Sequence, residues 1–262
     1  MEISDWIWAA VGAVELAWAA RLWQLVLVRS YPFLTSYLVF SAVHSIVSFA
    51  TYNAWGQYSV AYGRFWIITQ PILWVMLFCV VIEAYNHMLK GYEGLQRLGQ
   101  WGSHIALGTV ALIVLAMIVL DPPVDGASSP WAIFWIRQER SVYLALTVIC
   151  LVLVSVGAYY GLVVSRNVAT VFAVFGLLFL SHAGLSVFRD HLGAEFRLIK
   201  YTVAPILYIL WVIAGAFAFT RIGEERLADE TAAAWGDASG TTGQLTRQLE
   251  SVNQLLLRVL RS

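Results

Sequence analysis

The chain has 262 residues, of which 60% are hydrophobic and 12% are charged, and its formal net charge is zero. Soluble proteins carry about twice that fraction of charged residues, so most of this chain is expected to face lipid rather than water. The charges do not gather into a basic or acidic run, which argues against nucleic acid as a partner.

Seven apolar runs are long enough to cross the roughly 30 Å hydrocarbon core of a bilayer as helices. The sequence therefore predicts an all-α fold, a polytopic bundle of seven transmembrane helices within residues 1–221. Polar segments that contain glycine or proline separate most of the runs. The predicted spans are residues 6–28, 32–52, 65–89, 103–121, 140–164, 168–188 and 198–220.

The stretch "WAIFWIRQER", residues 131–140, precedes the fifth span. Its two tryptophans suit the headgroup level of a bilayer, which is consistent with a short helix lying flat at the membrane surface. An early start of the fifth helix is the alternative.

The expected orientation depends on the first span, because lysine and arginine are equally numerous in the loops on the two sides. Glu2 and Asp5 precede this span, whereas Arg21 and Arg29 close it. This asymmetry predicts that the N-terminus lies outside and the C-terminus lies in the cytoplasm.

The composition changes after the last span. Residues 222–242 are rich in small and polar residues and are expected to form a linker. Residues 243–262 are predicted to form an amphipathic helix that is too short to be stable alone in water. It is expected to dock on a second copy of the chain, on the membrane surface or the protein's own loops, or on a separate partner. Its apolar seam has the 4-3 spacing of a coiled coil and consists of Leu245, Leu249, Val252, Leu256 and Val259.

Four polar side chains are predicted to share one layer in the outer half of the membrane. They come from four different spans and are Glu15, His44, Gln70 and His182. Polar groups at membrane depth are costly and often functional, so the layer is a candidate pocket for a small molecule or an ion. The alternatives are interhelical hydrogen bonds without a ligand, such as a Glu15–His44 pair, and a cofactor site.

A second polar group is predicted at the inner end of the third span, within "VVIEAYNHMLKGYEGLQRLGQW", residues 80–101. Glu83 and His87 are four residues apart and would share one helix face. We expect them to lie near Arg29 and Arg166, with the carboxylate paired to one arginine as a structural inner clasp. A role in binding a proton or a ligand is the alternative.

The motifs of common enzymes, such as HExxH, GxSxG and the P-loop, do not occur in the sequence. The sequence therefore favours a non-catalytic membrane protein, namely a sensor, an adaptor or an assembly subunit, with the lipid bilayer and further copies of itself as partners. No cofactor is predicted.

Two other functions stay open. An electron-transfer subunit that binds haem or quinone would use His44 and His182 in one leaflet, with His87 and His104 in the other. A proton-coupled carrier would use Glu15 and His44.

The third span and its exit, "VVIEAYNHMLKGYEGLQRLG", and the link "VSRN" resemble an uncharacterised group of bacterial seven-helix membrane proteins. In that group the third helix ends in an acidic residue followed by an aromatic residue and a Gly-Leu turn. The resemblance covers residues 30 to 220. It implies a seven-helix architecture in the bacterial cytoplasmic membrane and no assigned chemistry.

Overall fold

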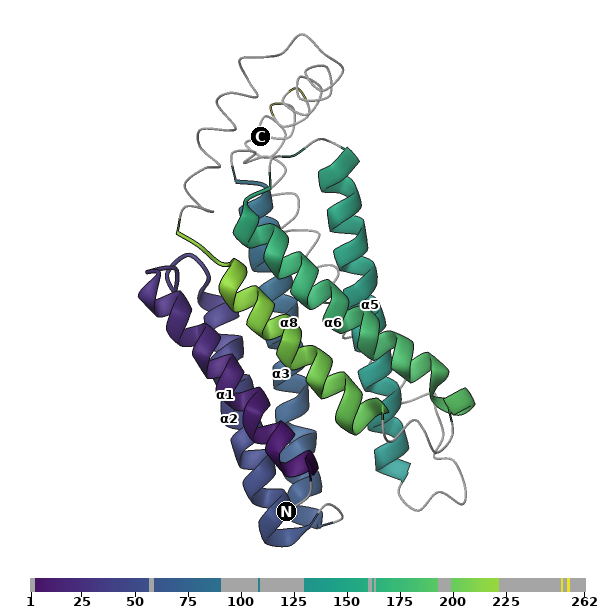
Figure 1. Ribbon diagram of the computed structural model, residues 1–262. Helices are drawn as coiled ribbons and strands as arrows, with labels where there is room; N and C mark the ends of the chain where they lie inside the picture. The colour runs from purple at the N-terminus through teal and green to yellow at the C-terminus, as the bar shows by residue number, and fades with distance from the viewer. Residues whose placement is uncertain are drawn as a thin grey trace.

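The computed structural model describes residues 3–56, 59–90, 130–159, 164–192 and 199–221, with four further single positions. These ranges are all-helical and contain no strand. The elements are α1 (Ile3–Gln24), α2 (Pro32–Trp55), α3 (Val60–Met88), α5 (Pro130–Tyr159), α6 (Arg166–Leu192), the π-helical turn η1 (Ile199–Val203) and α8 (Ala204–Ala218) (Figure 1).

Six of the seven predicted spans correspond to α-helices of this structure. The predicted span 103–121, the linker 222–242 and the seam residues of the C-terminal helix lie outside the described ranges. The fifth helix is continuous from Pro130, so residues 131–140 extend this helix and do not form a separate one.

Within the described ranges, four helices are long and apolar enough to cross a membrane, which is consistent with an integral membrane protein. The apolar stretches are Pro32–Trp55, Val60–Met88, Ser141–Tyr159 and Arg166–Leu185. Large apolar side chains also point away from the bundle; for example, Ile68 on α3 and Leu151 on α5 are 65% and 60% exposed. Such side chains are suited to contact with lipid, because water would make their exposure costly.

The six α-helices form a closed ring. Going around it, α1 packs on α2, α2 on α3, α3 on α5, α5 on α6, α6 on α8, and α8 on α1, while α3 also reaches α6. Figure 1 shows α8 lying between α1 and α6 on the near side of the bundle. A ring of this kind leaves its centre within reach of side chains from every helix.

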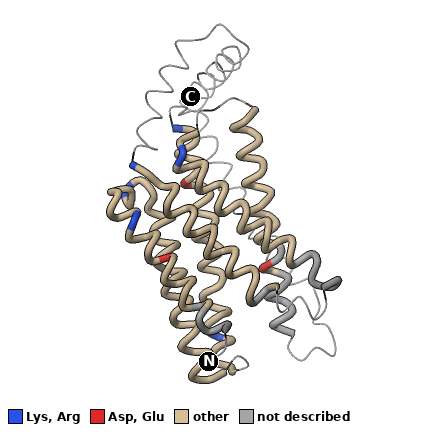
Figure 2. The backbone as a smooth tube through the Cα atoms, in the orientation of Figure 1, with Lys and Arg blue, Asp and Glu red and all other residues tan. Residues whose placement is uncertain are grey.

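One end of the ring, here called the clasp end, holds the α1–α2 connection, the C-terminal ends of α3 and α8, and the start of α6. Asn167 at the start of α6 hydrogen-bonds the backbone of Thr220 beyond α8, at 2.9 and 3.1 Å. The Arg21 guanidinium near the end of α1 donates to the carbonyl of Phe219 at 3.5 Å. Most of the lysines and arginines that the structure describes lie at this end (Figure 2).

The core between α1, α6 and α8 is aromatic. Trp18 is completely buried, with its ring centroid 6.3 Å from that of Phe175 and 5.6 Å from that of Phe219. A Cβ atom added at Gly215 of α8 would lie only 2.8 Å from the Trp18 ring. The glycine is therefore what lets α8 approach α1 so closely.

Candidate functional site: a polar pocket at the centre of the helix ring

A pocket of about 140 Å³ lies within the ring, and each of the six α-helices contributes to its wall. Three of the four residues predicted for the polar layer line it, namely Glu15, Gln70 and His182. The other described lining residues are Val11, Tyr37, Ser41, Leu73, Leu77, Tyr143, Leu178 and Tyr208.

Glu15 is the only carboxylate among the described lining residues, and it is completely buried. Its Oε1 atom accepts a hydrogen bond from the hydroxyl of Ser41 on α2 at 2.8 Å and another from the hydroxyl of Tyr208 on α8. Its Oε2 atom has no hydrogen-bond partner among the described residues. One carboxylate thus joins three helices through one oxygen and keeps the second oxygen unpartnered.

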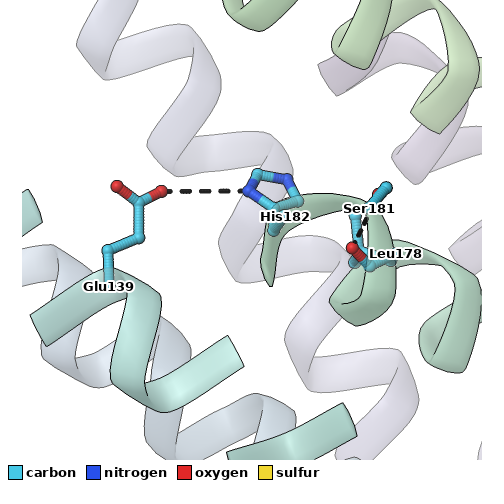
Figure 3. Close-up of polar contacts among 4 residues, drawn as sticks. All are labelled: Glu139, Leu178, Ser181 and His182. Carbon is cyan, nitrogen blue, oxygen red and sulfur yellow. Dashed lines mark hydrogen bonds and ion pairs between the residues drawn. The ribbon is translucent and has the colours of Figure 1, made fainter. Parts of the chain in front are cut away.

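His182 on α6 also lines the pocket, and its ring stacks on Tyr143 of α5 with centroids 4.4 Å apart. The Nδ1 atom faces the carboxylate of Glu139 on α5 at 3.9 Å, which is too long for a hydrogen bond and becomes an ion pair when the imidazole is protonated. Figure 3 shows Glu139 and His182 pointing toward each other across the gap between the two helices. On the other side of His182, the hydroxyl of Ser181 turns back to its own helix and donates to the carbonyl of Leu178 at 2.8 Å.

His44, the fourth residue of the predicted layer, is not among the described lining residues. Its ring stacks on Phe65 of α3, with centroids 5.3 Å apart, and its Nε2 atom has no hydrogen-bond partner among the described residues. A Glu15–His44 hydrogen bond therefore does not form here. The two histidines proposed as a haem pair also face different surroundings, because His44 contacts α3 and His182 contacts α5.

Gln70 enters the pocket immediately before Pro71, which lies inside α3. The predicted span began at residue 65, but the helix begins earlier, at Val60, where the Ser59 hydroxyl caps it by accepting from the Tyr62 amide. Proline has no N–H, so the helix lacks one backbone hydrogen bond at the level of the pocket.

The second predicted group, around Glu83, is close to the N-terminus of α2. The Glu83 carboxylate accepts hydrogen bonds from the backbone amides of Phe33 at 2.8 Å and Leu34 at 2.9 Å. The first amides of a helix have no partners within it, and their positive dipole end attracts a carboxylate. The N-cap residue of α2, Tyr31, provides no side-chain cap of its own. Glu83 therefore caps α2 from the neighbouring helix.

His87 extends this contact by one turn of α3. Its Nε2 atom lies 2.6 Å from the carbonyl oxygen of Ser30, and its ring stacks on Tyr31 with centroids 4.5 Å apart. Glu83 and His87 thus fix the α1–α2 connection and the start of α2 against α3.

The predicted arginine partners of Glu83 are not its partners in the structure. Arg29 and Arg166 are both exposed, and the contacts of the carboxylate are the two backbone amides. The two backbone amides at the start of α2 donate hydrogen bonds to the buried carboxylate, and no second charge has to be buried beside it. This explains why Glu83 does not need an arginine partner.

The wall of the pocket also contains residues that sequence reasoning did not select. Tyr37 and Ser41 lie on α2, Tyr143 on α5 and Tyr208 on α8. The sequence contained a pattern that could have identified the residues on α2, because Tyr37, Ser41 and Ser48 recur at helical spacing and would share one helix face. All three are buried in the structure. Tyr143 and Tyr208 stand alone in apolar runs, where a tyrosine gives no sign of which way its hydroxyl points.

Within the described residues, no group of three or more histidine, cysteine, aspartate and glutamate side chains is placed to hold a metal ion. No protein-family model, curated protein or solved structure matches the chain.

Proposed function

We propose that this chain is a non-catalytic integral membrane protein, a sensor, adaptor or assembly subunit, whose central pocket binds a small ligand. The observation that carries the proposal is that all six described α-helices line one pocket that contains Glu15, Gln70 and His182. A ligand in such a place contacts every helix at once, so its binding favours one packing of the ring over others.

The ligand-dependent change in helix packing would be transmitted from the pocket to the clasp end. Glu83 is separated from Gln70 by about 20 Å along α3, at a rise of about 1.5 Å per residue. In the proposed protein, a shift of α3 at the pocket moves Glu83 relative to the start of α2. The signal then passes to the chain beyond Arg221, where the predicted C-terminal helix self-associates or recruits a partner.

Native mass spectrometry of the full chain, released gently from its membrane, tests the pocket. The wild-type protein is expected to retain a small molecule, and Glu15→Gln is expected to lose it. His44→Gln is the control, since it alters a polar residue that is not among the described lining residues of the pocket and should retain the molecule. Equal retention by Glu15→Gln, or a wild-type protein without any retained molecule, contradicts the proposal.

The seven-span architecture and the orientation belong to the same proposal. Arg29 and Arg166 were predicted at the inner side, beside Glu83, and the contacts of α1, α2, α3, α6 and α8 support placing them together at the clasp end. The first span decides the orientation, because Glu2 and Asp5 precede it and Arg21 and Arg29 close it at the clasp end, which is therefore proposed to face the cytoplasm. A cysteine placed at Arg221 should react with an impermeant reagent only after the membrane is opened; reaction in intact cells contradicts this orientation.

The C-terminal helix is proposed to drive self-association. Truncation after residue 240 is expected to lower the oligomeric mass of the detergent-solubilised protein measured by light scattering. An unchanged mass contradicts this role of the helix.

A proton-coupled carrier is the second candidate, favoured by the hydrogen bond of Tyr208 to a fully buried Glu15. Glu15→Gln should then abolish proton-driven uptake in vesicles, whereas a sensor shows no such uptake in either form. The haem alternative requires a Soret band in the visible absorption spectrum of the purified protein, and a colourless sample excludes it. Bound quinone would be detected by extraction into organic solvent.

A further inference from the structure

We infer that the central pocket takes a compact organic monocation, an alkylammonium ion of about six non-hydrogen atoms or fewer. This inference rests on the proposed function, because it names the chemical class of the small ligand. It is carried by the charge of the wall, the second oxygen of Glu15, the aromatic side chains and the volume.

The charge of the wall is the first step. Among the described lining residues there is no lysine or arginine, and Glu15 is the only carboxylate. Glu139 is not among the lining residues, but it faces His182 at 3.9 Å from the adjoining turn of α5 and compensates the charge of a protonated imidazole. An ionised Glu15 therefore leaves the wall with a negative charge. An anionic ligand would add to this charge, whereas a cation reduces it.

The second step is the geometry of Glu15. Both hydroxyl donors, from Ser41 and Tyr208, go to Oε1, and Oε2 has no partner among the described residues. A fully buried carboxylate oxygen without a partner is unfavourable, and a charged donor is the partner that stabilises it most. An ammonium group that carries an N–H provides this donor, and a fully alkylated ammonium group provides the opposite charge alone.

The third step concerns the other walls of the pocket. Three tyrosines from three helices, Tyr37, Tyr143 and Tyr208, line it. Aromatic rings attract cations through their negative faces, and cages of several rings bind alkylated ammonium groups. The remaining apolar lining, Leu73, Leu77 and Leu178, suits the carbon atoms of an organic cation better than it suits a hydrated metal ion.

The fourth step is size. The pocket measures about 140 Å³. An engineered cavity of about 150 Å³ in another protein accommodates benzene, a molecule of six non-hydrogen atoms. Tetramethylammonium and shorter alkylammonium ions fall within this limit, whereas drug-sized ligands occupy pockets of roughly 300 Å³ or more.

The test uses the full-length protein in detergent and two probes of equal size and similar shape, tetramethylammonium chloride and tert-butanol, with sodium chloride as the salt control. Thermal unfolding and titration calorimetry measure binding. Tetramethylammonium is expected to raise the melting temperature in a saturable way, and tert-butanol and sodium chloride are not. Glu15→Gln should weaken tetramethylammonium binding at least tenfold, and the control His44→Gln, at a polar residue that is not among the described lining residues, should bind it like the wild-type protein.

Tyr143→Leu provides a second test in case the Glu15→Gln variant does not fold. This substitution removes one aromatic side chain from the wall of the pocket and leaves the hydrogen bonds of Glu15 in place. It should also weaken tetramethylammonium binding. Equal stabilisation of wild type, Glu15→Gln and Tyr143→Leu identifies a general salt effect and overturns the inference.

Failure of this inference and failure of the proposed function give different results. Saturable, Glu15-dependent binding of tert-butanol without tetramethylammonium binding keeps the pocket as a ligand site and overturns the cationic class. If a molecule is retained in native mass spectrometry but tetramethylammonium does not bind, the pocket likewise remains a ligand site and the cationic class is overturned. Absence of both retained molecule and probe binding overturns the inference and the proposed function together.

Discussion

The side-chain amide of Asn167 pairs with the backbone of Thr220, donating to its carbonyl at 2.9 Å and accepting from its N–H at 3.1 Å. This pair fixes the exit of α8 against the start of α6, at the clasp end. Asn167 is completely buried, so these bonds are shielded from water.

Removal of this pair should destabilise the bundle. Asn167→Ala is expected to lower the free energy of unfolding by about 2–3 kcal/mol, since it breaks two hydrogen bonds and leaves backbone groups without partners. Thermal unfolding in detergent measures the effect. Thr170→Ala on the same helix is the control, because the Thr170 hydroxyl bonds only the carbonyl of Arg166 at 2.8 Å within α6. Equal melting temperatures for the two variants would show that the Asn167–Thr220 pair is not important.

Alanine substitutions at Gly215 of α8 and Gly176 of α6 should change the stability of the protein in opposite directions. Gly215→Ala places a methyl group 2.8 Å from Trp18 and 3.1 Å from Val174, and the overpacking should cost about 1–3 kcal/mol. Gly176→Ala meets nothing within 4 Å and should stabilise the protein by about 0.5–1 kcal/mol through helix propensity. The melting temperatures of the two variants should move in opposite directions. A shift of the same sign would contradict the close α1–α8 contact.

Substitutions around Glu83 distinguish the observed cap from the expected arginine clasp. Glu83→Ala leaves the amides of Phe33 and Leu34 without their acceptor and should lower the free energy of unfolding by about 2–4 kcal/mol. Arg29→Gln and Arg166→Gln should leave the melting temperature unchanged within error. A large loss on changing either arginine, with little loss for Glu83→Ala, would restore the arginine clasp.

The connection between α1 and α2 contains a strained backbone position, and relief of this strain should stabilise the protein. Val26 has a φ angle of 60°, in the left-handed region that β-branched residues rarely adopt. Val26→Gly should therefore raise the free energy of unfolding by up to about 1 kcal/mol, while Val28→Gly, at a neighbouring position of ordinary φ, should lower it. Destabilisation by both changes would indicate that the side chain of Val26 is needed.

The helical architecture was predictable because lipid imposes a strong rule: a span must be long, apolar and helical. Six of the predicted spans overlap described helices, although the start of α3 was placed too late because Ser59 and Tyr62 form a cap in a segment that reads as a polar loop. The early start of α5 at Pro130 was one of two predicted alternatives.

The candidate site was predictable only in part, and the reason is geometric. Depth along a helix follows from residue number, so Glu15, Gln70 and His182 were placed in one layer and line one pocket. The rotation of each helix about its axis does not follow from depth. His44 accordingly lies at a similar predicted depth but faces Phe65, and the tyrosines of α5 and α8 were not selected.

The cap that Glu83 places on α2 also bears on how the chain assembles. During synthesis α2 emerges before α3, so the amides of Phe33 and Leu34 enter the membrane region while their acceptor has not yet been made. The start of α2 is completed only when α3 has been inserted far enough to bring Glu83 back to it. The start of α2 and the end of α3 therefore reach their final packing together, and a chain that stops before Glu83 leaves the amides of Phe33 and Leu34 without this acceptor.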